Sequence, residues 1–422
     1  MLRDLIFVSN ISENRIAHIA RAVIKHKFIL LFLLASFFRG LEFSGVVLVP
    51  FFKDWGGLNQ FQTQLLQSWF MLWIFFLEIP TGVMGDRIGV KSSTLIGLLT
   101  SGGAALICIS TPDFYIFLFA EFLFATAAAF VSGSQEAWLY ELVKEAGLSR
   151  MYTQLQVLSK NLYLLAMIVT SLTASFVSHF LGVRLMFSTI GVSAFIAFLF
   201  LLFVPRPKKD VNAELVPNYK RIIRESIKLL RKNKVLINDI AFVTVFSSLG
   251  YFVIWLQQTM MQDLGIPVTH FGWYRLIFLS AQIVLGFILA RMLRDRRSSQ
   301  RFDLLVAFLL SGAYIFAGLM HNTLGLIVYL AIVGGLGMQI RTIYSKQINE
   351  HIPTDKRATM LSMISMIHRI TLVILNPLVG MLVDFQGISL AGWHFSGLYL
   401  SFLALGIMGF IALAYRLFSY LE

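Results

Sequence analysis

Nine ionisable side chains lie inside long apolar stretches of this sequence, where a charged group is expected to be paired or to serve a function. They are Arg39, Glu42, Glu78, Glu121, Glu136, Lys160, Arg275, Arg341 and Arg369. Insertion scales assign about 2.5 to 3.5 kcal/mol to such a group at the centre of a membrane-spanning helix. Each of the nine is therefore a candidate for proton transfer, ion pairing or solute binding.

The four glutamates, Glu42, Glu78, Glu121 and Glu136, are the candidates for carrying a coupling proton. A carboxyl group in a low-dielectric cavity can take up and release a proton near neutral pH, as proton coupling requires. Glu121 and Glu136 are separated by close to four helical turns, so both can face one cavity. Glu121 lies deeper in its stretch, whereas Glu136 lies near an end, where it can instead pair with a Lys or Arg.

Two of the arginines, Arg39 and Arg341, are candidates for holding an anionic group, because a guanidinium can donate paired hydrogen bonds to it. Arg39 and Glu42 lie three residues apart on one helix face and can pair. That pair is either a fixed structural contact or one that a solute or proton opens. Lys160 and Arg275 lie near the ends of their stretches, so we expect their side chains to reach water.

Twelve helices are predicted to position these side chains. A helix of about 20 apolar residues crosses a bilayer, and the sequence offers twelve stretches: 28–52, 62–84, 93–111, 114–138, 154–180, 184–204, 236–261, 269–292, 302–320, 323–346, 358–383 and 395–417. They are too long for the strands of a membrane barrel. Apolar residues make up 57% and charged residues 14% of the chain, against about 45 to 50% and about 25% in soluble domains. The prediction is an all-α membrane protein.

The basic residues predict how the helices are oriented. Of the 35 Lys and Arg, 28 lie in the two termini and in the loops after every second helix, while the opposite loops hold only Lys53 and Arg184. Basic residues mark the cytoplasmic side, so we expect both termini there, in a multi-pass protein of the plasma (inner) membrane. The net charge of +13 is then a topology signal and requires no nucleic acid as a partner.

Four regions follow from this pattern. They are a cytoplasmic amphipathic segment over 1–27, a six-helix bundle over 28–204, a basic cytoplasmic linker over 205–235 and a second six-helix bundle over 236–422. The lone cysteine, Cys108, and the absence of metal-ligand spacing predict no metal site. We expect no cofactor, and a monomer in a lipid bilayer.

The two bundles resemble each other at a single offset of 204 residues. Matches occur at Trp69 and Trp273, Gly82 and Gly286, Arg87 and Arg291, Gly133 and Gly337, Gln135 and Gln339, and Tyr140 and Tyr344. Polar and small residues that recur in one register indicate parallel repeats, with a binding site near the midplane between them. Gln135, Tyr140 and Gln339 are therefore added to Arg39 and Arg341 as candidates for solute binding.

The loop after the second stretch carries the most specific motif. Gly82, Asp86, Arg87, Gly89 and Lys91 resemble the G-x-x-x-D-R-x-G-R-[RK] signature of the major facilitator superfamily, with Val90 where that family has a basic residue. Gly82 is expected to allow close helix contact and Gly89 a tight turn. The resemblance extends over the whole chain through the topology, the basic central loop and the repeat.

This resemblance implies a fold of two six-helix halves, and a loop that latches the halves on the cytoplasmic side when the protein faces outward. Asp86 would then act on the start of the eleventh helix, and Arg87 on Glu141 or Glu145. The family also places its second and eleventh helices side by side. Glu78 and Arg369 lie at depths that differ by only about 4 to 5 Å, so an ion pair between the halves is predicted.

The function predicted on these grounds is secondary active transport of a small organic solute by alternating access, coupled to a proton or another ion. No phosphate-binding loop of an ATPase occurs, and the eight histidines are scattered, which argues against a pump and an enzyme. A non-transporting receptor or scaffold on the same fold stays an alternative. Within transporters, a multidrug/proton antiporter and an anion/proton symporter are both open.

Overall fold

The computed structural model describes residues 23–207, 234–292, 296–342, 344, 352, 357–390 and 393–421. Most of the predicted segment 1–27 and of the predicted linker 205–235 lies outside these residues. We refer to the described residues 23–207 as the N-terminal half and to those from 234 onward as the C-terminal half.

The N-terminal half is helical almost throughout. Its helices are α2 (Lys27–Gly40), α3 (Leu48–Pro50), α4 (Gln60–Ile88), α5 (Val90–Cys108), α6 (Phe114–Val131), α7 (Ser134–Glu145) and α8 (Tyr152–Leu202), with 3-10 turns at Ser44–Val46 and Ser149–Met151 and a π-helical turn at Phe51–Trp55.

The C-terminal half adds one small hairpin to its helices. Its elements are α10 (Lys234–Asp263), a 3-10 turn (Val268–His270), α11 (Phe271–Met292), α12 (Arg296–Leu319), α13 (Thr323–Tyr329), a π-helical stretch (Leu330–Gly337), α15 (Arg357–Asp384), β1 (Ile388–Leu390), β2 (Trp393–Phe395) and α16 (Gly397–Leu421). The two strands pair antiparallel, with Ile388 opposite Phe395.

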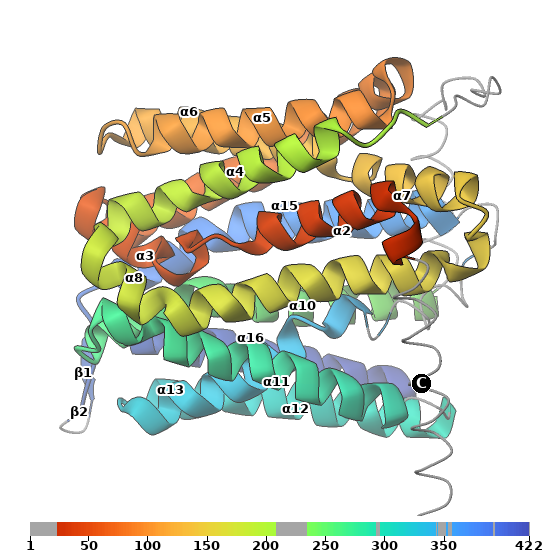
Figure 1. Cartoon of the computed structure of the whole chain (residues 1–422). Helices are drawn as coiled ribbons and strands as arrows, with labels where there is room; N and C mark the ends of the chain where they lie inside the picture. Colours follow the sequence, from red (N-terminus) through yellow and green to blue (C-terminus); the bar gives the residue numbers. More distant parts are fainter. Residues whose placement is uncertain are drawn as a thin grey trace, which may run out of the picture.

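The long helices lie side by side and span the molecule from end to end (Figure 1). Within the halves, α2 packs on α8, α5 on α6 and α12 on α16; the halves meet where α4 lies along α15 and α11 along α8. The most apolar window of α10 is 78% buried, against 22 to 56% for the other candidate spans. This helix therefore lies at the centre of the bundle.

Nine helices in the described residues are long and apolar enough to cross a membrane, or ten if the two parts of α4, which bend by 50°, form one span. Two helices, α8 and α11, explain why this count differs from the twelve predicted stretches. Helix α8 covers two of them, 154–180 and 184–204, with a break at Gly182, where φ is 65°. Helix α11 covers the stretch 269–292 but is not among those nine.

The first predicted span, 28–52, is interrupted in the structure. Helix α2 ends at Gly40, and irregular backbone with a 3-10 turn leads to α3. A Cβ atom on Gly40 would lie 2.5 Å from the carbonyl oxygen of Tyr163 in α8. The glycine therefore permits a close crossing of α2 and α8 directly before the interruption.

Candidate functional site

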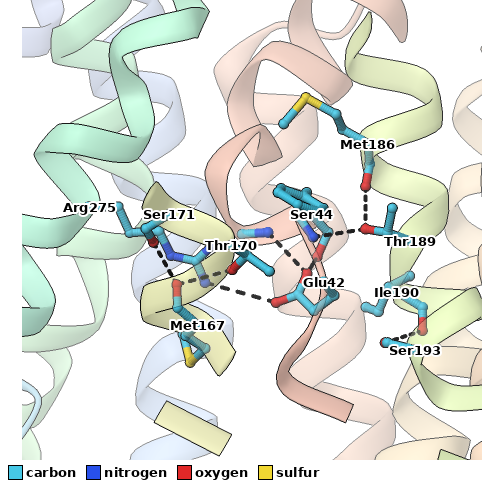
Figure 2. A network of polar contacts seen from close by, with 12 residues as sticks. Glu42, Ser44, Met167, Thr170, Ser171, Met186, Thr189, Ile190, Ser193 and Arg275 are labelled. Atoms are coloured by element: carbon cyan, nitrogen blue, oxygen red, sulfur yellow. Dashed lines mark hydrogen bonds and ion pairs between the residues drawn. The ribbon is translucent and has the colours of Figure 1, made fainter. Parts of the chain in front are cut away.

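The interruption of α2 places Glu42 in a buried polar network (Figure 2). Ser44 donates its hydroxyl hydrogen to Glu42, and the backbone N–H of Gly45 donates to Glu42 Oε2 at 3.3 Å. The distance between Nη2 of Arg275, in α11, and Oε1 of Glu42 is 3.9 Å. Arg275 is only 6% exposed and Glu42 only 8%. An acid of one half is therefore paired with a base of the other.

This pairing corrects two expectations. Arg39 does not pair with Glu42, because the chain leaves the helix at Leu41 and turns Glu42 away from the preceding helical face. Arg275 does not reach water, because α11 packs tightly on α8: a Cβ atom on Gly272 would lie 2.2 Å from the carbonyl oxygen of Ser171.

A central cavity of about 350 Å³ opens beside this network. Its polar walls include Arg39, Glu42, Gln67 and Glu121, and its aromatic walls are Phe70, Phe124, Tyr163, Phe187, Tyr251 and Trp255. Both halves contribute, since Tyr251 and Trp255 belong to α10. Size and lining are those of a small-molecule site, with apolar walls and few polar groups.

Glu121 is the least exposed acid of this cavity, at 6%. Gln67 Nε2 donates to its Oε1 at 3.5 Å, the hydroxyl of Tyr251 donates to Gln67 Oε1 at 3.5 Å, and Trp255 Nε1 donates to the Tyr251 oxygen at 3.3 Å. No Lys or Arg pairs with Glu121 among the described residues. Its carboxyl group thus ends a chain of long hydrogen bonds that begins in the other half.

A second cavity of about 690 Å³ lies within the N-terminal half, between α2, α6, α7 and α8. Arg39 borders both cavities and donates from Nη1 to Gln135 Oε1 at 2.7 Å. Lys160 Nζ lies 3.2 Å from Glu136 Oε1, and both side chains are more than half exposed. Glu136 thus has the basic partner that its position near a stretch end allows, and the exposed Lys160 supplies it.

Glu78 and Arg369 form the ion pair between the halves that the sequence predicts. Arg369 Nη1 donates to Glu78 Oε2, and Arg369 Nη2 donates to Glu78 Oε1 at 3.3 Å. The pair connects α4 with α15, the two helices that lie along each other. Nearby, Arg341 Nη2 donates to the hydroxyl of Ser365 at 2.5 Å.

Two further solute-binding candidates are engaged elsewhere. Gln339 donates to the carbonyl oxygen of Gln282 at 2.6 Å, which ties the turn after the π-helical stretch to α11. Tyr140 is 44% exposed and packs edge-on against Tyr152 at 5.1 Å between ring centroids. Neither residue lines the two cavities described above.

The loop motif is accessible in this structure. Gly89 separates α4 from α5 with a φ of 88°, as the predicted turn requires, and Lys91 Nζ donates to the carbonyl oxygen of Leu202 at 2.7 Å. Asp86 and Arg87 are exposed. Glu141 lies 3.7 Å from Lys144 rather than in a described pair with Arg87.

Gly82 makes no close helix contact within the described part of the chain. No atom of another described element lies within 4 Å of the position that a Cβ atom on Gly82 would take, contrary to the expected role.

The halves are joined most densely at the opposite end of the bundle, which we call the closed end; it carries α3, β1 and β2 (Figure 1). There Gln258 accepts from the N–H of Val49 and donates to the carbonyl oxygen of Gly45, both at 3.0 Å. Gln60 donates to the hydroxyl of Thr259 at 2.6 Å. Beyond the Glu78–Arg369 pair, no hydrogen bond between described residues joins the halves near the loop motif.

Two acidic residues complete the closed end. Gln262 donates to Asp54 Oδ2 at 2.8 Å. Partial burial raises the pKa of the Asp54 carboxyl, while the charge of Lys53 and the hydrogen bond from Gln262 act in the opposite direction. Asp384, the last residue of α15, accepts from the first two N–H groups of α4, those of Gln60 at 3.1 Å and Phe61 at 2.7 Å.

A buried charge cluster in the C-terminal half is missing from the predictions. Arg416 Nη2 lies 2.7 Å from Asp239 Oδ1 and 2.9 Å from Asp303 Oδ2, and Tyr344 donates to Asp303 at 2.7 Å. Each charged residue lies near an end of its apolar stretch, and none is among the nine interior charges that the sequence indicates. Their shared depth on three helices is the signal that would have revealed them.

Comparison with known proteins gives a consistent picture. The sequence model of the Major Facilitator Superfamily matches residues 28–259 and 240–421. Among solved structures, the nucleoside transporter NupG superposes with a TM-score of 0.72 at 14% identity over 93% of this chain and 99% of its own. The inward-open xylose transporter XylE from E. coli gives 0.66 at 12% identity over 92% of this chain and 95% of its own. At these identities the similarity concerns the fold.

Similarity to curated sequences is more limited. Multidrug resistance protein MdtM of Escherichia coli O157:H7 is 24% identical over 224 residues, and its counterpart from strain K12 gives the same figures. The aligned region covers 52% of this chain, which spans about half the length of these relatives.

Proposed function

We propose a function in transport for this chain, which belongs to the Major Facilitator Superfamily. It would act as a secondary active transporter that moves a small organic solute across the plasma membrane by alternating access, coupled to a proton. The observation that carries this proposal is Glu121, an acid without a described basic partner that lines a cavity walled by both halves.

A twelve-span topology fits the described helices. It follows if the bent α4 is one span, α8 forms two spans on either side of Gly182 and α11 is included. The distribution of Lys and Arg then favours a cytoplasmic location for both termini and for the loop that carries Gly89. The closed end would face the outside.

Alternating access is supported by the unequal contacts at the two ends. The side chains of Gln258, Gln60 and Gln262 bind across the closed end, whereas Asp86 and Arg87 are exposed at the other. A latch that acts only in the outward-facing state would be open in this arrangement. The structure then corresponds to an inward-facing state.

Glu121 is the residue best suited to couple proton movement to this cycle. A buried carboxylate without a cation is costly, so its ionisation depends on which partners the cavity offers. The hydrogen-bond chain through Gln67 and Tyr251 links the acid to α10 of the other half. Loss or gain of one proton can therefore bias the contact between the halves.

The experiment is solute flux in proteoliposomes with an imposed pH gradient, using solutes that first stabilise the purified protein against heat. The wild type should accumulate solute when the gradient is present and stop when a protonophore removes it. Glu121→Gln should still exchange solute across the membrane but lose accumulation. Asp113→Asn is the matched control: it changes an exposed acid at the start of α6 that lines neither cavity, and it keeps a side-chain oxygen that can cap the helix.

Two outcomes would contradict the proposal. Failure of the wild type to move any solute that binds would indicate a receptor or scaffold on this fold. Gradient-driven accumulation by Glu121→Gln would remove the coupling role from that residue.

A multidrug/proton antiporter is the second candidate, favoured by the similarity to MdtM and by the aromatic walls of the central cavity. It predicts that flux of lipophilic cations runs against the movement of protons.

A further inference from the structure

The charges in the interior of the described chain are nearly all matched by an opposite charge. The pairs are Glu42 with Arg275, Glu78 with Arg369, and Asp239 and Asp303 with Arg416. Isolated charges in a low-dielectric interior are costly, so such pairing is the expected arrangement. An interior charged side chain that lacks an oppositely charged partner therefore requires a different explanation.

Among the charged residues that line the central cavity, Arg39 and Glu121 are the two without a charged partner in the described residues. Arg39 binds only the neutral amide of Gln135, through one nitrogen. Glu121 is held only by the long hydrogen bond from Gln67. The two differ in access, since Arg39 is partly exposed and borders both cavities, whereas Glu121 is buried.

This difference decides which charge a solute meets first. A guanidinium has five N–H donors in a planar fork that fits a carboxylate, and one hydrogen bond to Gln135 leaves most of them available. A buried carboxyl group that lacks a cation avoids the cost of charge by keeping its proton. With the proton on Glu121, the unpaired charge at the cavity is that of Arg39, which is positive.

We propose that the solute is a small organic anion whose carboxylate binds Arg39, with its apolar or aromatic part against the walls of the central cavity. This inference rests on the proposed transport function and names its substrate class. The aromatic side chains of Phe70, Phe124 and Trp255 supply the apolar walls. The proton on Glu121 keeps the loaded cavity close to neutral, so anion and proton are bound together.

The test compares two probes with the same apolar body and opposite charge, phenylpropionate and phenylpropylamine. Their binding to the purified full-length protein is measured by titration calorimetry at mildly acidic and mildly alkaline pH. We expect phenylpropionate to bind, more tightly at acidic pH, and phenylpropylamine not to bind.

Variants then assign the binding to the two residues. Arg39→Gln should weaken phenylpropionate binding about tenfold or more, because a charge-assisted hydrogen bond is lost. Arg39→Lys should be intermediate, since it keeps the charge without the fork. Arg184→Gln removes an equal charge outside both cavities and should leave binding unchanged. Glu121→Gln should bind with the acidic-pH affinity at both pH values.

Melting temperatures of the unliganded variants establish that each one folds. If phenylpropylamine binds, and its binding weakens in Glu121→Gln but not in Arg39→Gln, the inference is overturned in favour of an organic cation. Binding of neither probe would overturn it as well, because the cavity would then not recognise an anion of this kind.

The inference and the transport function can fail separately. If phenylpropylamine is transported in exchange for protons, the transport function holds and the inference of an anionic solute is wrong. If phenylpropionate binds through Arg39 but does not accumulate in response to a gradient, the binding site holds and the transport function is wrong.

Discussion

At the scale of single residues, the buried pair of Glu42 and Arg275 shows how one interrupted helix changes the partners of a charge. The carboxylate is also held by Ser44 and by the N–H of Gly45, so it would stay in place without its base. A buried charge that loses its only opposite partner is strongly destabilising.

We predict that Arg275→Leu lowers the free energy of unfolding by about 2 to 4 kcal/mol, because Glu42 is left buried and uncompensated. The measurement is the melting temperature of the purified protein in detergent. Adding Glu42→Gln to this variant should recover most of the loss, since the unpaired charge is removed. A double variant as unstable as the single one would show that the ion pair is not the cause.

The sequence predicted part of this residue-scale picture. Matching depth sufficed for Glu78 and Arg369 once the family resemblance placed their helices side by side, as α4 and α15 are in the structure. A pair of Arg39 and Glu42 was considered because the apolar stretch continues past Gly40, where α2 ends. Gln67 and Tyr251 were overlooked beside Glu121, although an amide inside an apolar stretch is itself a signal.

At the scale of elements, α10 crosses the π-helical stretch at a point where two glycines meet. A Cβ atom on Gly250 would lie 2.3 Å from the carbonyl carbon of Gly337. Backbones that approach this closely leave no space for any side chain. The crossing therefore sets the position of the central helix in the C-terminal half.

Gly250→Ala is predicted to destabilise the protein by about 1 to 3 kcal/mol, because the two backbones must move apart. Gly312→Ala in α12 is the matched control: no atom of the described residues lies within 4 Å of its Cβ position, and alanine favours a helix. Thermal unfolding of both variants checks this. Equal melting temperatures would contradict the importance of the crossing.

The elements were more predictable than the site. Apolar length located most of the described helices, although the stretch 28–52 holds α2 and α3 with an interruption between them. It also separated 154–180 from 184–204 where the helix breaks at Gly182, whose φ is 65°. It could not reveal that the stretch from Leu330 to Gly337 is π-helical, because this depends on how the backbone is packed by neighbouring helices, which composition does not encode.

At the scale of the whole molecule, α4 and α15 form the longest contact between the halves, with the Glu78–Arg369 pair toward one end and Asp384 at the other. We infer that the ion pair breaks and re-forms as the halves rock. Like charges at this point would disfavour the present arrangement.

Glu78→Arg and Arg369→Glu are each predicted to lower the rate of solute uptake into proteoliposomes, because each places two like charges together. The double variant, with the charges exchanged, should recover most of the rate. Melting temperatures give a readout that does not depend on the solute and should follow the same pattern. A double variant no better than either single one would mean that the contact is incidental.

The position of Asp384 has a consequence for how the helix that it contacts begins. The N–H groups of Gln62 and Thr63 are satisfied within the N-terminal half, by the side-chain and backbone oxygens of Asn59, but those of Gln60 and Phe61 are satisfied by Asp384 of the other half. Part of the secondary structure of one half is thus completed by the other. When the halves separate here, water must replace the carboxylate, so hydration of the first turn of α4 is inseparable from opening of this end.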